Sequence, residues 1–185
     1  MRYLIAGNPA YGLSKAISER MPEASWHSRS YNNSDLTSVA SQKQFAIDSL
    51  DYDVIIVVSC LWGYEQVKLT ERIGKTWAEK GHDGYLIVLG SSADTPVKGT
   101  VWGYPAEKKA LRAYCRQLSQ MSAGENSHKF KCTYLSPGNM HTPKQDEKMP
   151  GVVKLNTAYV ADVIVWLTLQ PKTVNISELT LDAIP

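Results

Sequence analysis

The sequence has few cysteines, little net charge and no long apolar run. Cys60, Cys115 and Cys132 form no C-x-x-C pair, which favours reduced thiols over a disulfide framework. A formal net charge of +2 gives no strong electrostatic reason to expect a nucleic-acid partner. The apolar run at the N-terminus is too short for a signal peptide, and no stretch approaches the roughly 18 to 20 apolar residues of a membrane-spanning helix. We therefore expect a cytoplasmic protein that binds neither nucleic acid nor membrane.

The composition itself is that of an ordinary globular protein. Apolar residues make up 43% and charged residues 21%, which excludes a disordered chain, a collagen and a disulfide-rich miniprotein. The 185 residues predict a single domain, because one domain takes about 150 residues. The histidines are scattered with no ligand spacing, so we expect no metal site.

Strand-like and helix-like patterns alternate along the chain. Residues 54–58 and 85–89 are continuous apolar runs, which are typical of strands buried on both faces of a parallel sheet. Further strands are expected at 3–6, 24–28, 131–135 and 179–181, and helices at 12–21, 35–50 with Asp35 as its cap, 65–80, 105–120 and 156–169, with a loop over 139–155. The alternation predicts an α/β fold with a doubly wound, mostly parallel, Rossmann-like sheet of six or seven strands and helices on both faces. In such sheets ligands bind beyond the carboxyl ends of the strands.

The turn after the first expected strand is rich in small residues. Gly7 and Gly12 let the backbone pass close to a diphosphate, and the free amides of the following helix would attract it. Any tight turn between a strand and a helix could use the same residues, so this turn alone leaves both interpretations open.

Ser91, Tyr104 and Lys108 form a sharper pattern. Tyr104 and Lys108 are four positions apart and therefore lie side by side on one helix face. An ammonium beside a phenol favours the phenolate and would lower the tyrosine's pKa from about 10. Ser91 follows a buried strand directly, so its hydroxyl would stand at the carboxyl edge of the sheet. A tyrosine and a lysine at this spacing also occur often by chance, so the pair alone does not decide the function.

Together these features resemble the short-chain dehydrogenase/reductase family. The resemblance rests on a serine followed thirteen positions later by Tyr-x-x-x-Lys, and on the glycine turn at Gly7 and Gly12. Asp35-Leu36-Thr37 resembles the family's Asp-Val-Thr segment near the adenine. Residues 136–143 resemble its Pro-Gly-x-x-x-Thr loop beside the nicotinamide. Residues 1–185 would then form one dinucleotide-binding domain that also carries the active site.

The resemblance implies hydride transfer between a nicotinamide cofactor and a small carbonyl or alcohol substrate, without a metal. Tyr104 would exchange the proton, Ser91 would orient the substrate oxygen, and Lys108 would lower the tyrosine's pKa and bind the nicotinamide ribose. The cofactor would be bound by residues from four turns and the segment near the adenine: Gly7, Asn8, Tyr11, Gly12, Leu13, Ser28, Arg29, Asp35, Leu36, Ser59, Cys60, Pro137, Gly138, Met140 and Thr142.

The end of the second expected strand bears on the choice of cofactor. An acidic residue there would bind the ribose hydroxyls of NAD, whereas an arginine suits the 2′-phosphate of NADP. The chain has Ser28-Arg29-Ser30 at this position, and no carboxylate until Asp35. We therefore expect NADP rather than NAD, with an ordinary solvated arginine as the alternative.

The chain departs from the family pattern at several positions. Ser14 replaces the third glycine of the turn, Cys60 lies where the family has Asn-Asn-Ala-Gly, and Lys68 or Val67 replaces an asparagine of the proton relay. Residues 29–35 are too few for the usual second helix and third strand, which matches the abbreviated members of the family. These losses leave an alternative, a dinucleotide-binding sensor or interaction module with impaired catalysis.

Some further residues have weaker indications. Trp62 and Trp102 are candidates for aromatic walls of a substrate pocket, and His141 for its lining, although core packing is as good an interpretation for the tryptophans. A homodimer is expected by resemblance, with Trp77, Leu111 and Leu118 as apolar positions for the contact. Finally, one helical stripe is basic and would suit RNA or DNA, although a solvated helix face is favoured there: Lys108, Lys109, Arg112 and Arg116.

Overall fold

A single parallel sheet organises the chain in the computed structural model, which describes residues 1–95, 100–121 and 127–184. Its strand order is β2-β1-β3-β4-β5-β6, and every neighbouring pair is parallel. The chain winds from β1 outward to β2 and then from β3 to β6 in the other direction, so the winding reverses between β1 and β3. The strands are β1 (Tyr3–Ala6), β2 (Ser25–His27), β3 (Val54–Val57), β4 (Tyr85–Leu89), β5 (Lys131–Pro137) and β6 (Glu178–Leu181).

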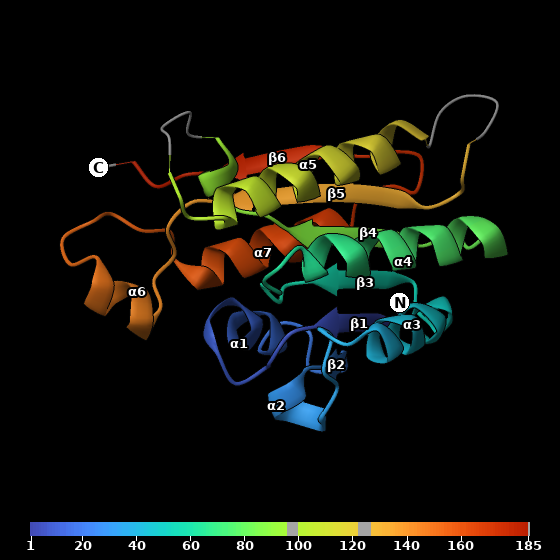
Figure 1. The fold of residues 1–185 in the computed structure, drawn as a ribbon, viewed down its shortest axis with the longest axis horizontal. Coiled ribbons are helices and arrows are strands. Elements are labelled where there is room, and N and C mark those ends of the chain that lie inside the picture. The colour runs from blue at the N-terminus through green and yellow to red at the C-terminus, as the bar shows by residue number, and fades with distance from the viewer. Residues whose placement is uncertain (96–99, 122–126, 185) are drawn as a thin grey trace.

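Helices cover both faces of the sheet (Figure 1). One face carries α1 (Gly12–Ser18) and α7 (Thr157–Thr168), which pack against each other. The other carries α3 (Val39–Asp48), α4 (Glu65–Lys80) and α5 (Tyr104–Met121). Two short helices, α2 (Arg29–Asn32) and α6 (Pro143–Lys148), follow the ends of β2 and β5. This arrangement confirms the predicted doubly wound α/β fold.

The core consists of two apolar layers, one on each side of the sheet. Successive side chains of a strand point to opposite faces. Accordingly, Leu4 packs in the layer beneath α3, α4 and α5, and its neighbour Ile5 packs in the layer beneath α1 and α7. Every residue of β3 and β4 is buried, as their continuous apolar runs predicted. This rigid centre fixes the positions of the turns that follow each strand.

The observed elements differ from the predicted ones at a few places. Asp35 does not cap α3; the cap is Ser38, whose hydroxyl accepts a hydrogen bond from the Ser41 amide, while the Asp35 carboxylate binds Thr37. The predicted loop at 139–155 contains α6, which begins at Pro143 after the capping residue Thr142. Both helices start at local side-chain caps, which periodicity does not reveal.

The apolar positions suggested for a homodimer contact are also wrong. Trp77, Leu111 and Leu118 are buried within the core of the chain itself and leave no surface for a partner. The homodimer and the cytoplasmic location stay predictions. Within the described residues, no helix is both long enough and apolar enough to cross a membrane.

Gly90, directly after β4, provides a test of this packing. A Cβ at Gly90 would lie 2.0 Å from Cζ of Tyr134, a buried ring on β5 that has no room to retreat. We expect Gly90→Ala to lower the free energy of unfolding by about 2–3 kcal/mol because of this overpacking. Gly103→Ala is the matched control, since the nearest atom to its Cβ would be at 3.9 Å. Equal urea denaturation midpoints for the two variants would contradict the packing.

Candidate functional site

The turn after β1 lies between the ends of β2 and β3. The Gly7 amide donates to His27 O at the end of β2 (3.0 Å), and the amide of Ser59, after β3, donates to Ala6 O (2.8 Å). A Cβ at Gly7 would approach Ser14 Oγ to 2.6 Å, so glycine here makes room for the Ser14 side chain. The small residue needed for close contact of strand and helix is thus Gly7, and Ser14 packs beside it.

Helix α1 begins at this turn without a side-chain cap from its capping residue. Its capping residue, Tyr11, is exposed and forms no side-chain hydrogen bond to the helix. Gly12 has a φ of +50°, a left-handed conformation that favours glycine. A Cβ at Gly12 would lie 3.4 Å from Cγ2 of Thr142, so the loop after β5 reaches this helix terminus. The amides at such a terminus are suited to binding a phosphate.

The segment after β2 approaches the same turn. Asn8 donates from Nδ2 to Ser30 Oγ at 2.7 Å, while its Oδ1 accepts from the Ala10 amide at 2.9 Å. Asn8 therefore ties the turn after β1 to the residues after β2. The Ser28 Oγ is buried, and nothing in the described part of the chain forms a hydrogen bond with it. The next residue, Arg29, is exposed.

Tyr104 and Ser91 meet beyond the end of β4. The Tyr104 side chain is half-buried at the first residue of α5, and it lies beside the side chains of Ser91 and Cys60. Burial raises the pKa of Tyr104, and the contact with Ser91 opposes this increase. The net shift is therefore upward, opposite to the predicted lowering of this pKa.

Cys60 is one of the residues predicted to bind the cofactor. The residue is exposed, and its side chain lies beside Tyr104. Desolvation by its neighbours raises the pKa of the thiol, so it is a neutral group at this edge of the sheet.

Lys108 is directed into the protein rather than toward solvent. Its residue is 4% exposed, and its Nζ donates to Gln66 Oε1 at 2.6 Å and approaches Leu89 O at 3.5 Å. The amide nitrogen of Gln66 donates to the same Leu89 carbonyl at 2.8 Å. Nζ lies 5.3 Å from the centroid of the Tyr104 ring. Burial lowers the pKa of Lys108, and the nearby carboxylates of Glu107 and Asp94 partly offset this effect.

Gln66 is a residue of this site that the sequence did not reveal. The resemblance suggested Lys68 or Val67 for the relay position; Lys68 pairs with Glu65 and Val67 packs against the core, whereas Gln66 is the residue that contacts Lys108. Gln66 lies in the first turn of α4 and is buried against α5. Only the tertiary contact with Lys108 identifies Gln66 as a residue of the site.

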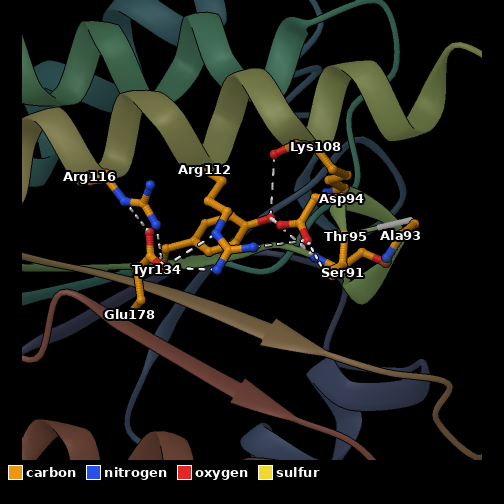
Figure 2. A network of polar contacts seen from close by, with 9 residues as sticks. All are labelled: Ser91, Ala93, Asp94, Thr95, Lys108, Arg112, Arg116, Tyr134 and Glu178. Atoms are coloured by element: carbon orange, nitrogen blue, oxygen red, sulfur yellow. Dashed lines mark hydrogen bonds and ion pairs between the residues drawn. The ribbon is translucent and has the colours of Figure 1, made fainter. Parts of the chain in front are cut away.

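A network of polar contacts supports the Ser91 turn from below (Figure 2). The Tyr134 hydroxyl donates to Asp94 Oδ2 at 2.7 Å and lies 3.4 Å from the Ser91 amide. Asp94 is buried and pairs with Arg112 at 3.4 Å. Figure 2 shows Arg112 reaching from α5 toward Glu178 of β6, to which it pairs at 3.0 Å. The network therefore joins the turn after β4 to α5, β5 and β6.

This network also accounts for most of the predicted basic stripe. Arg112 and Arg116 both pair with Glu178, and Lys108 is buried. Three of the four cations in the stripe are thus either paired with a carboxylate or buried, so they do not form an unpaired basic face.

The loop after β5 forms the remaining side of the site. Met140 and Leu155 form an isolated parallel bridge that closes the base of this loop. Thr142 caps α6, and His141 pairs with Asp146 inside the loop at 3.0 Å. Gly138 follows β5 against Asp182, and the preceding Ser136 has a buried Oγ with no hydrogen-bond partner among the described residues.

Two residues predicted to bind the cofactor have their side chains in the core. Leu13 packs in the layer beneath α1 and α7, and Leu36 in the layer beneath α3 and α4. Among the described residues, no group of three His, Cys, Asp or Glu side chains is placed to hold a metal ion.

Comparisons with known proteins agree with this geometry. No model of a protein family matches the sequence, and no curated protein matches it either. The fold resembles that of solved short-chain dehydrogenase/reductase structures. A short-chain dehydrogenase from Burkholderia cenocepacia in complex with NADP aligns with 98% of this chain and 88% of its own, at 14% identity and a TM-score of 0.76.

Two further structures show the same similarity. A closed form of serine dehydrogenase with NADP+ covers 98% of this chain and 94% of its own, at 16% identity and a TM-score of 0.73. A short-chain dehydrogenase from Bacillus anthracis gives the same two coverages, at 14% identity and a TM-score of 0.74. This chain therefore has the fold of short-chain dehydrogenase/reductase proteins, as the sequence motifs predicted.

The contact between Gln66 and Lys108 yields a stability prediction. Gln66→Leu would leave the buried ammonium without its nearest acceptor, so we expect the free energy of unfolding to fall by about 2–3 kcal/mol. Gln44→Leu is the matched control, because Gln44 is exposed and its Nε2 donates to Asp48 on its own helix, and it should change stability by less than about 0.5 kcal/mol. Chemical denaturation of both variants measures the difference, and similar losses would refute the structural role of Gln66.

Proposed function

We propose that this protein is an NADP-dependent oxidoreductase of the short-chain dehydrogenase/reductase type. It would transfer hydride between nicotinamide and a small carbonyl or alcohol, with Tyr104 as general acid and base. The observation that carries the proposal is the convergence of three groups beyond the carboxyl end of β4. The Tyr104 side chain lies beside Ser91, and the Lys108 ammonium lies 5.3 Å from the centroid of the tyrosine ring.

The residues around the turn after β1 fit a dinucleotide. The first amides of α1 and the left-handed Gly12 suit the diphosphate. The unpartnered Ser28 Oγ and the adjacent exposed Arg29 suit a 2′-phosphate, and the unpartnered Ser136 Oγ lies at the end of β5. Two of the similar solved structures are described with NADP. When bound, the cofactor supplies or accepts a hydride at its nicotinamide ring.

In the reducing direction, Tyr104 acts as the proton donor. The substrate carbon gains a hydride, and its oxygen gains the Tyr104 proton, so the carbonyl becomes an alcohol and the cofactor is left oxidised. Ser91 Oγ orients the substrate oxygen next to the phenol. Because burial raises the pKa of Tyr104, the hydroxyl is protonated near neutral pH and ready to donate. The Lys108 ammonium stabilises the phenolate that remains until solvent returns a proton.

A substitution of Tyr104 tests this function directly. NADPH consumption is measured with a panel of aldehydes and ketones, and we expect Tyr104→Phe to reduce kcat/KM by about 10³-fold, since it removes the proton donor. Its affinity for NADPH should stay within about twofold of the unsubstituted protein, because the change removes only the hydroxyl. Tyr159→Phe, at an exposed tyrosine of α7, is the control and should keep full activity.

Two outcomes would count against the enzyme. An active Tyr104→Phe variant would remove the tyrosine from the mechanism. Tight binding of NADPH with no turnover of any carbonyl would favour the alternative of a dinucleotide sensor or interaction module.

The choice of NADP is tested at Arg29. We expect Arg29→Ala to weaken NADPH binding by about 30-fold, the equivalent of about 2 kcal/mol for a charge-assisted contact, and to leave NADH binding within about twofold. Lys80→Ala removes an exposed cation at the end of α4 and serves as the control. Calorimetric titration measures all three proteins, and an equal effect on NADPH and NADH would show that Arg29 does not contact the 2′-phosphate.

A further inference from the structure

Three aromatic side chains gather at the entrance to the catalytic groups. We refer to Trp62, Trp102 and Tyr104 as the aromatic cluster. Trp102 stacks on Tyr104 with ring centroids 4.8 Å apart and an interplanar angle of 20°. Trp62 contacts the same tyrosine at 5.3 Å and Trp102 at 6.4 Å. The two indoles are 56% and 54% exposed, whereas the phenol between them is half-buried.

The cluster is held by contacts between distant segments. Trp62 lies between β3 and α4, and Trp102 lies just before α5. The Gly63 amide donates to Glu107 Oε1 at 3.2 Å, which joins the segment of Trp62 to the first turn of α5. The Trp102 amide donates to Thr100 Oγ1 at 3.1 Å. Trp62 is therefore fixed beside Tyr104 by a backbone contact rather than being an isolated surface residue.

Such a cluster leaves a large apolar surface in contact with water. Water around exposed indole rings is released when an apolar molecule covers them, and aromatic molecules gain further from ring-to-ring contact. The Tyr104 hydroxyl, with Ser91 beside it, marks where a carbonyl oxygen would bind. A ring attached to that carbonyl would then lie within reach of the indoles.

The charges around the cluster indicate whether the substrate carries a charge. Glu107 places a carboxylate at the edge of the cluster, through its bond to Gly63. Lys108, whose Nζ lies 5.3 Å from the centroid of the Tyr104 ring, is turned inward to Gln66 and is not available to pair with a substrate carboxylate. Among the described residues, the charge placed at this edge is therefore the Glu107 carboxylate, which would repel an anionic substrate.

We propose that the substrate is an uncharged aryl aldehyde or aryl ketone whose ring binds against Trp62 and Trp102. This inference rests on the proposed function and specifies its substrate class. The carbonyl carbon receives the hydride from NADPH and the carbonyl oxygen receives the Tyr104 proton. The products are an aryl carbinol and NADP+.

The first experiment compares three matched ketones. Acetophenone and cyclohexyl methyl ketone differ in the aromaticity of the ring. 4-Acetylbenzoate is acetophenone with an added carboxylate and therefore carries a negative charge. We expect kcat/KM for acetophenone to be about fivefold higher than kcat/KM for cyclohexyl methyl ketone, because of the aromatic contact. We also expect kcat/KM for acetophenone to be about tenfold or more higher than kcat/KM for 4-acetylbenzoate. Equal values for acetophenone and the cyclohexyl ketone would overturn the aromatic preference, and a preference for the anion would overturn the charge argument.

The second experiment assigns the preference to Trp62. We expect Trp62→Leu to remove most of the fivefold preference while retaining activity on the cyclohexyl ketone, and Trp62→Phe to restore the preference in part. Trp166→Leu is the matched control, because Trp166 is 49% exposed on α7, on the opposite face of the sheet. The inference fails if Trp62→Leu keeps the same ratio of kcat/KM values as the control.

A third measurement does not depend on turnover. The chain has five tryptophans, and their indole N–H signals in NMR spectra are assigned with single Trp→Phe variants. Titration of acetophenone in the presence of NADP+ should shift the signals of Trp62 and Trp102 and leave that of Trp166 in place. Such shifts without any reductase activity would refute the proposed function and support the binding site. Unmoved signals of Trp62 and Trp102 in an active enzyme would overturn the site and retain the function.

Discussion

The buried ammonium of Lys108 is the constraint around which the site is arranged. A charged group taken out of water must find partners, or the fold loses several kcal/mol. Lys108 finds them in Gln66 on α4 and in the carbonyl of Leu89 at the end of β4. One side chain thus fixes α5 relative to both a neighbouring helix and the central strand. Because Tyr104 is one turn away on α5, its position follows from the same contacts.

The Asp94 network holds the same helix one turn further along, at Arg112. Asp94 is buried and satisfied by Tyr134 and Arg112, and Arg112 extends the network to Glu178 on the edge strand β6. Burial and the Asp94 carboxylate raise the pKa of Tyr134, so this tyrosine stays a hydrogen-bond donor. Partly satisfied polar networks are costly, whereas complete ones define a unique arrangement. The turn that carries Ser91 is therefore held by polar contacts beneath it as well as by the strand before it.

Much of the fold could be predicted from the sequence, because its signals are local. The apolar runs of β3 and β4 and the glycine that ends α4 correspond directly to observed elements. The motif of Ser91, Tyr104 and Lys108 also depends on spacing, which a helix and a strand end convert into proximity. Caps such as Ser38 were missed, because several neighbouring residues could have served equally well.

The parts that could not be predicted all depend on tertiary contacts. Gln66 becomes important only because α4 packs against α5, and its neighbours Val67 and Lys68 are equally plausible in the sequence. The packing of Trp62 and Trp102 around Tyr104 joins segments that are separated by a whole strand and helix. The pKa of Tyr104 depends on burial, which the spacing of residues does not report.

The neutral character of Gln66 explains how the buried charge remains useful. A carboxylate in its place would satisfy Lys108 more strongly, but it would also cancel the positive charge that a phenolate at Tyr104 requires. A glutamine accepts the ammonium through Oε1 and is itself anchored through Nε2 to Leu89 O. The lysine is thereby held in place without being neutralised. Burial raises the pKa of Tyr104 and favours the protonated phenol, whereas an ammonium 5.3 Å from the ring favours the phenolate, so the two effects oppose each other in the proton affinity of this one hydroxyl.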